Sequence, residues 1–286
     1  MRISPQGGEQ RFSERAAQGV ERVLQAAVPQ VSAAAPVALP LLQRFTAVYI
    51  QDSPQVQVPA VLAEVGAGSG GGARAEDQTA ALKLQGRLDL KRGALSGPCL
   101  PAGRASARTS PIQHAPLPAG SLRLADLGYF ALDVLQTIAP QQAYCLTRLR
   151  AGTQVFTAQG PVGDLASWLR QQSTALVDVP VSVGTHHRLP CRGVAVRVPP
   201  EVATQRRSHL HADARRRGQA VSRARWGLAD WTLFCTTGPS ALLRGSAVVG
   251  LARVRGQIEV LFTLWKHEGP LAPSRSPNPW RGRCEG

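Results

Sequence analysis

Two short apolar segments of this chain each lead into an aspartate, and a long amphipathic segment near the C-terminal end carries a glutamate. Residues 45–50 are β-branched and aromatic and are followed by Asp52, whereas residues 121–126 end on Asp126. Both segments are predicted to be strands. Glu259 lies in the amphipathic segment, which is predicted to be a helix. The order of these three acids along the chain limits the fold more than the composition does.

The remaining segments predict an alternation of strands and helices. Strands are expected at residues 82–90, 94–100, 144–149, 154–157, 177–183, 193–198 and 231–236, and helices at 12–27, 129–138, 164–171, 201–217 and 240–266. This order predicts an α/β fold with a ribonuclease-H-like core and a mixed sheet. A β-rich insertion is expected between Asp126 and the helix with Glu259. In such a core the first and fourth strands are neighbours, so Asp52 and Asp126 are expected to be close in space.

The expected domain boundaries follow from the same order. They are an N-terminal helical segment and linker at 1–44, the first part of the core at 45–150, a β-rich insertion with a basic helix at 151–230, the second part of the core at 231–266 and a disordered tail at 267–286.

The chain is strongly basic, with 33 lysine and arginine residues against 18 acids and a formal charge of +15. Such a charge suits a polyanionic partner such as DNA or RNA. All but three of the bases are arginines, the exceptions being Lys83, Lys91 and Lys266. A genome rich in G and C would produce the same bias without selection for phosphate contacts, so this alternative stays open.

Five cysteines lie far apart without paired spacing, which indicates neither a zinc site nor a disulfide framework. The polar and charged start of the chain does not resemble a signal peptide. Prolines interrupt the uncharged residues 23–43, which makes them unsuitable as a membrane span. A cytoplasmic protein without membrane contact is expected.

Three blocks of sequence resemble the catalytic blocks of DDE transposases, in the branch named after insertion sequence four. They are Tyr49-Ile-Gln-Asp-Ser53, Leu124-Ala-Asp-Leu-Gly-Tyr-Phe130 and Arg255-Gly-Gln-Ile-Glu-Val-Leu-Phe-Thr-Leu-Trp-Lys266. The signature of that branch is Tyr, two residues, Arg, three residues, Glu, six residues, Lys. Arg255, Glu259 and Lys266 match it in register. Ala252 replaces the Tyr, Gly256 the Trp that usually follows the Arg, and Pro54 the Thr expected after Asp-Ser.

The resemblance implies a set of partners and roles. Asp52, Asp126 and Glu259 would hold two Mg²⁺ or Mn²⁺ ions and act as catalytic carboxylates, and Arg255 and Lys266 would grip terminal phosphates. The implied partner is double-stranded DNA, both the terminal inverted repeats and the target. A dimer across paired DNA ends and a location at the bacterial nucleoid are also implied. The chain is expected to be shorter than its relatives.

Several alternatives remain beside this interpretation. An aspartate after a strand often forms a turn or caps a helix, which applies to Asp52 and Asp126. Glu259 and Arg255 could form an exposed intrahelical ion pair. In the basic helix, Arg206 and Arg207 are expected to contact the DNA backbone, although some arginines there must simply be solvated. The whole chain could be a catalytically inactive remnant that still binds DNA, or a nuclease that cuts without joining.

Overall fold

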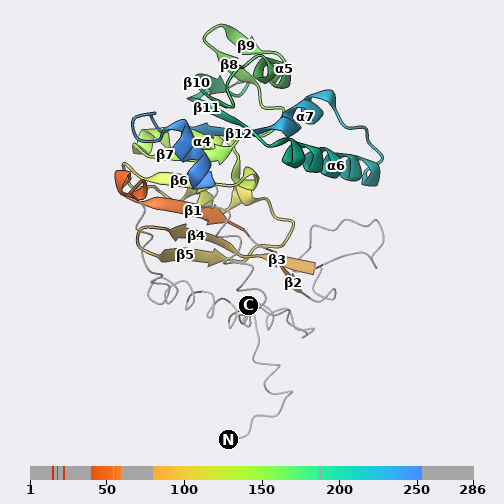
Figure 1. Cartoon of the computed structure of the whole chain (residues 1–286). Coiled ribbons are helices and arrows are strands. Elements are labelled where there is room, and N and C mark those ends of the chain that lie inside the picture. The colour runs from red at the N-terminus through yellow and green to blue at the C-terminus, as the bar shows by residue number, and fades with distance from the viewer. Residues whose placement is uncertain are drawn as a thin grey trace, which may run out of the picture. The chain divides into compact units, whose positions relative to one another are not determined.

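The computed structural model describes Arg15, Gln18, Arg22 and residues 40–53, 55–58, 80–186 and 188–252. The chain divides into two compact units. The first comprises residues 1–43, 47–116 and 254–286, and the second comprises residues 44–46 and 117–253. Figure 1 gives the labels of the elements. Within the described residues, no helix is both long and apolar enough to span a bilayer.

The first unit contains an antiparallel sheet of three strands in the order β5-β4-β1. These are β1 (Val48–Asp52), β4 (Gln85–Asp89) and β5 (Ala94–Cys99). A separate pair is formed by β2 (Gln55–Val58) and β3 (Ala80–Lys83). The single strand expected at 82–90 is therefore wrong. Strand pairing changes at Leu84. Before it β3 pairs with β2, and after it β4 pairs with β1 and β5.

Two short helices follow β5 in the first unit, η4 (Ala107–Thr109) and α3 (Pro111–His114). The fully buried amide of Gln51 on β1 donates to the carbonyl oxygen of Ile112 at 2.9 Å. A buried amide without a partner would be costly, so this bond fixes α3 against the sheet.

The second unit contains a larger mixed sheet in the order β6-β7-β12-β11-β10-β8-β9. Its strands are β6 (Leu122–Ala125), β7 (Tyr144–Arg148), β8 (Val155–Thr157), β9 (Gly160–Val162), β10 (Leu176–Val183), β11 (Leu189–Arg197) and β12 (Trp231–Thr236). The pair β6 and β7 is parallel, whereas the others are antiparallel. The α/β class and the mixed sheet are thus confirmed, and β9 is a strand that the sequence pattern did not predict.

Helices connect these strands. They are η5 (Leu127–Tyr129), α4 (Leu132–Gln136), η6 (Ala139–Gln141), α5 (Leu165–Arg170), α6 (Pro200–Arg216), α7 (Arg223–Gly227) and η7 (Leu228–Asp230), and η1 (Leu42–Arg44) precedes β1. The helices expected at 164–171 and 201–217 are confirmed within one residue. The helix expected at 129–138 is shorter, because Phe130 and Ala131 are extended.

The last expected helix, at 240–266, begins later than predicted. Residues 240–242 form a turn, and the helix starts at residue 245 and is described as far as residue 252. The amides of Leu242 and Leu243 both donate to the carbonyl oxygen of Pro239, at 3.1 and 2.9 Å. These bonds close a single turn that is not continued, so the regular helix starts only at residue 245.

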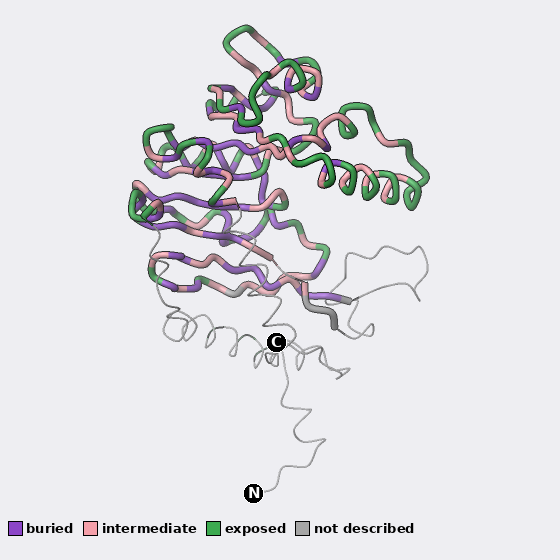
Figure 2. The backbone as a smooth tube through the Cα atoms, in the orientation of Figure 1, coloured by how far each residue is buried: buried purple, intermediate pink, exposed green. Residues whose placement is uncertain are grey.

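One face of the larger sheet buries an apolar core against α5. Leu169 of α5 packs with Val177, Ala195 and Trp231 from three adjacent strands. Each of these side chains is at most 5% exposed. Figure 2 shows the buried residues concentrated along the strands, whereas α6 is largely exposed. Burial at this face therefore holds the sheet, and α6 depends on contacts along one side only.

Gly97 allows a test of the packing in the first unit. Its φ is +101°, and a Cβ added there would come within 2.9 Å of the Gln85 carbonyl oxygen and 3.0 Å of the Ile112 Cδ1. We expect Gly97→Ala to lower the free energy of unfolding by more than the ~1 kcal/mol that a positive φ alone costs. Urea denaturation followed by circular dichroism measures this change.

Gly152→Ala is the matched control. Gly152 also has a positive φ, of +87°, but nothing lies within 4 Å of its added Cβ. The expected loss is therefore only the backbone term of ~1 kcal/mol. Equal losses for the two variants would show that the contact at Gln85 does not constrain Gly97.

Candidate functional site

The carboxyl ends of β6 and β7 bring Asp126 beside a base. The two strands are parallel, and their last paired residues are Ala125 and Thr147. Asp126 follows one and Arg148 follows the other, so both lie at the same edge of the sheet. Asp126 is half-buried and Arg148 is exposed. An acidic and a basic residue thus follow paired positions at the edge where open α/β sheets usually bind ligands.

Asp126 occupies the cap position of η5 without serving as its side-chain cap. Its carboxylate accepts no capping hydrogen bond, and the helix start is closed instead by its main-chain carbonyl, which accepts the Tyr129 amide at 3.0 Å. The helix-cap alternative for this carboxylate is therefore wrong.

Arg206 reaches the same edge from α6. Its Nη1 donates to the Trp231 carbonyl oxygen at 3.0 Å, and its Nη2 donates to the Thr232 Oγ1 at 2.9 Å. Both acceptors belong to the start of β12, which is antiparallel to β7. Burial lowers the pKa of the Arg206 guanidinium from its ordinary value, and repulsion from Arg148 adds to the effect. Arginine nonetheless remains charged, so Arg206 adds a second positive group to the edge that carries Asp126 and Arg148.

The inward face of α6 explains where its arginines lie. Its more buried positions are Val202, Ala203, Arg206, Arg207, Leu210, Asp213 and Ala214, which recur at helical spacing. Arg207 is on this face, where its Nη2 forms an ion pair with the Asp230 Oδ1 at 2.6 Å. Its guanidinium also lies 5.3 Å from the centre of the Trp226 ring. Arg206 and Arg207 thus both anchor α6, and the DNA contact predicted for them stays a prediction.

Asp52 belongs to the first unit. It is the last residue of β1 rather than a residue just past its end, and it pairs in register with Gly86 of β4. The Ser53 amide donates to its Oδ1 at 2.8 Å. Its carboxylate is half-buried. Because Asp52 and Asp126 belong to different units, their expected closeness stays a prediction.

The third predicted block lies outside the described residues. Arg255, Glu259 and Lys266 all fall there, and so does Pro54. Ala252, at the position of the signature Tyr, is the last described residue of the helix that begins at residue 245. Within the described part of the chain, no three His, Cys, Asp or Glu residues gather as a metal site. The metal site predicted from three acids therefore remains a prediction.

A single guanidinium fixes the connection that leads toward this third block. Arg192 on β11 forms an ion pair with Asp178 on β10 through two nitrogens, with Nε to Oδ1 at 3.0 Å. Its Nη1 donates to the carbonyl oxygens of Gly238 and Leu243, each at 2.8 Å. Gly238 and Leu243 lie between β12 and the helix that begins at residue 245. One side chain therefore holds both ends of that connection.

The helix start lies directly against this ion pair. A Cβ added to Gly245 would come within 2.8 Å of the Asp178 Oδ2, so only glycine allows this approach. A carboxylate at the start of a helix is favoured by the positive end of the helix dipole. Because Asp178 and Val177 are adjacent in β10, their side chains point to opposite faces of the sheet. The helix therefore starts on the face away from α5.

No family model matches this chain. It is similar to the transposase for insertion sequence element IS231F of Bacillus thuringiensis subsp. israelensis, with 24% identity over 92% of this chain and 59% of that protein. The transposases for IS231C and IS231B of Bacillus thuringiensis subsp. berliner are 25% and 23% identical over the same shares. The chain thus spans about three fifths of the length of these curated relatives.

These similarities confirm the resemblance to insertion-sequence transposases that the three blocks predicted. The narrower branch named after insertion sequence four stays a prediction. Two candidate residues were not found from the sequence, Arg148 and Arg192. Arg148 could have been found, because it ends the strand that follows the Asp126 strand. Arg192 carried no signal, since its acceptors Gly238 and Leu243 come together only through the sheet.

Replacing Arg192 tests its role in holding this connection. We expect Arg192→Met to lower the free energy of unfolding by about 2–4 kcal/mol, because Asp178 and two carbonyl oxygens lose their donor. The Arg192 and Asp178 side chains are only 14% and 25% exposed, so water replaces the lost bonds poorly. Urea denaturation provides the measurement.

Arg216→Met is the control within the same unit. Arg216 forms an ion pair with Asp213, but these side chains are 77% and 44% exposed. Its removal is expected to change stability by less than about 1 kcal/mol, since exposed pairs contribute little. If both variants lost the same stability, Arg192 would have no special role at the connection.

Proposed function

We propose that this chain is an insertion-sequence transposase that cuts and joins DNA in a metal-dependent reaction, with Asp52, Asp126 and Glu259 as its catalytic carboxylates. The observation that carries the proposal is the position of Asp126 at a basic sheet edge, in a chain whose known relatives are transposases. Assignment to the branch named after insertion sequence four rests on the register of Arg255, Glu259 and Lys266.

The candidate donors suit magnesium or manganese. Carboxylate oxygens are hard ligands of the kind that Mg²⁺ and Mn²⁺ prefer. The Asp52 and Asp126 carboxylates are half-buried, so neither is sealed within the core. These two residues, with Glu259, would hold two ions. When bound, such ions stabilise the attacking and leaving oxygens of a displacement at phosphorus.

The arginines at the sheet edge have a separate task. Arg206 is held by the main chain of β12, so its charge has a fixed position. Arg148 is exposed, and it follows Thr147, which pairs with the residue before Asp126. The fixed charge of Arg206 and the exposed charge of Arg148 favour the approach of a phosphodiester despite the negative charge of Asp126. Arg255 and Lys266 would add phosphate contacts from the third block, as the resemblance implies.

The proposed substrate is double-stranded DNA, at the terminal inverted repeats of the element and then at the target. Water would attack first to expose a 3′ hydroxyl, which would then attack the target strand. A dimer that holds two DNA ends is the proposed assembly. The formal charge of +15 supports a polyanionic substrate.

The carboxylate of Asp126 provides the direct test. We expect Asp126→Asn to reduce magnesium-dependent cleavage by about 100-fold or more, because the amide weakens metal binding and removes a negative charge. Binding to DNA should change little, since Asp126 would act on the reaction rather than on the duplex. Cleavage of duplexes copied from the DNA beside the gene, followed on sequencing gels, measures the rate, and fluorescence anisotropy measures affinity.

Asp133→Asn is the matched control, because Asp133 is an exposed aspartate on α4 of the same unit. It should cleave at the wild-type rate. If Asp126→Asn cleaved DNA at the wild-type rate, Asp126 would not belong to the proposed site. A wild-type chain that binds these duplexes but never cuts them would instead favour the inactive remnant.

A further inference from the structure

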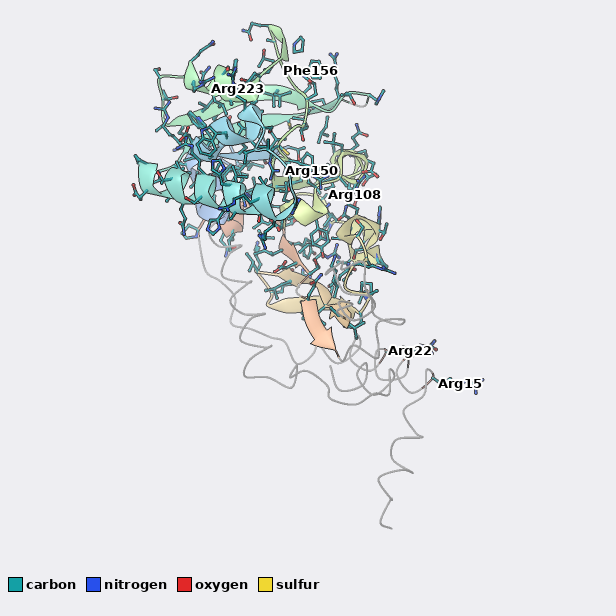
Figure 3. All side chains as sticks on the ribbon, turned by 90° about the vertical axis from the view of Figure 1, so that its right-hand side faces the viewer. Arg15, Arg22, Arg108, Arg150, Phe156 and Arg223 are labelled. Carbon is teal, nitrogen blue, oxygen red and sulfur yellow. The ribbon has the colours of Figure 1, made fainter. Side chains whose placement is uncertain are left out.

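Helices α6 and α7, with the turn between them, form an arm that leaves the sheet of the second unit (Figure 1). We define the arm as residues 200–227. Its exposed arginines lie in two places, at the end of α6 and in the first residues of α7, and they are Arg215, Arg216, Arg217, Arg223 and Arg225. Figure 3 turns this side toward the viewer and labels Arg223. The base of the arm, in contrast, is the part held against the sheet by Arg206 and Arg207.

The arm carries an excess of charge that it does not neutralise itself. Its sequence contains two acids, Glu201 and Asp213. Glu201 lies at the opposite end of α6 from the exposed arginines, and Asp213 is paired with Arg216. The remaining exposed arginines are therefore available to an external anion. Ion pairs formed by such exposed arginines would contribute little to the stability of the fold.

The geometry of α6 sets the distance between the arm's end and the candidate site. Arg206 is anchored at the start of β12, beside the edge that carries Asp126 and Arg148. Arg217 is at the C-cap of the same helix. A helix rises about 1.5 Å per residue, so Arg217 lies about 16 Å beyond Arg206 along the axis. Phosphates follow each other at about 3.4 Å per step along a duplex, so this distance corresponds to about five base pairs.

We propose that the exposed arginines of the arm grip the backbone of duplex DNA about five base pairs from the phosphate that reacts at the Asp126 edge. This inference rests on the proposed function. The contact is to phosphates rather than to bases, because solvated arginines on a helix end carry charge without a rigid arrangement that could read base edges. The arm thereby supports the duplex at a second point, apart from the reaction.

The test combines an arm variant with a series of duplex lengths. The variant carries Arg215→Gln, Arg217→Gln, Arg223→Gln and Arg225→Gln together. Arg216 is left unchanged because it is paired with Asp213. The probes are fluorescent duplexes copied from the DNA beside the gene, with either about three or about ten base pairs on each side of the cut site. Anisotropy gives the dissociation constant at several salt concentrations, and circular dichroism checks the fold.

We expect the arm variant to bind the long duplex about tenfold or more weakly than wild type. The slope of the logarithm of affinity against the logarithm of salt concentration should fall by an amount that corresponds to up to about four lost phosphate contacts. On the short duplex the two proteins should bind equally, because the DNA ends before it reaches the arm. A second variant with lysine at the same four positions should restore the advantage of the long duplex. Phosphate binding needs a positive charge there rather than the arginine fork.

A control removes the same charge elsewhere, through Arg104→Gln, Arg108→Gln, Arg170→Gln and Arg188→Gln, all at exposed positions. Its loss of affinity should not depend on duplex length. If the arm variant bound the long duplex with the same salt dependence as the wild-type chain, the inference would be overturned. An equal loss of affinity on both duplexes would overturn it too. Absence of salt-dependent binding by the wild-type chain would overturn the proposed function itself.

Discussion

The parallel pairing of β6 with β7 is the constraint on which the candidate site depends. Parallel strands end at the same edge, so Asp126 and Arg148 are brought together although 21 residues separate them in the sequence. Every other strand pair of that sheet is antiparallel, among the residues described. The single parallel pair is therefore also the place where two carboxyl ends coincide. Arg206 adds its charge at this edge because β12 starts there.

Two arginines hold the two ends of β12, each through several acceptors, and only Arg206 lies at this edge. Arg206 attaches α6 to the start of β12, and Arg192 attaches β10 and β11 to the connection after β12. Strand β12 is thus held at both ends by guanidinium groups from segments that the sequence assigned to an insertion. Displacement of either group would disturb the strand that lies between the candidate site and the last helix.

The sequence predicted much of this structure, for reasons that can be stated for particular elements. Residues 144–149 and 231–236 are mostly apolar or aromatic with threonines among them, and Asp164 caps α5 because its carboxylate accepts the amides of Ala166 and Ser167. These signals are local. The break at Leu84 in the strand expected at 82–90 and the late start of the last helix depend instead on pairing between distant segments. The inward orientation of Arg206 and Arg207 likewise depends on which face of α6 the strand β12 covers, and charge alone does not indicate this.

The number of acceptors around each guanidinium bears on why arginine is so common in this chain. Arg192 contacts one carboxylate and two carbonyl oxygens at once, and Arg206 contacts a hydroxyl and the main chain. A lysine ammonium has no planar fork and could not satisfy such spread acceptors together. At these positions an exchange of arginine for lysine would lower the stability of the fold. At the solvent-facing end of α6 the same exchange would change stability little, so related chains should carry lysine in place of arginine there and not at residues 192 and 206.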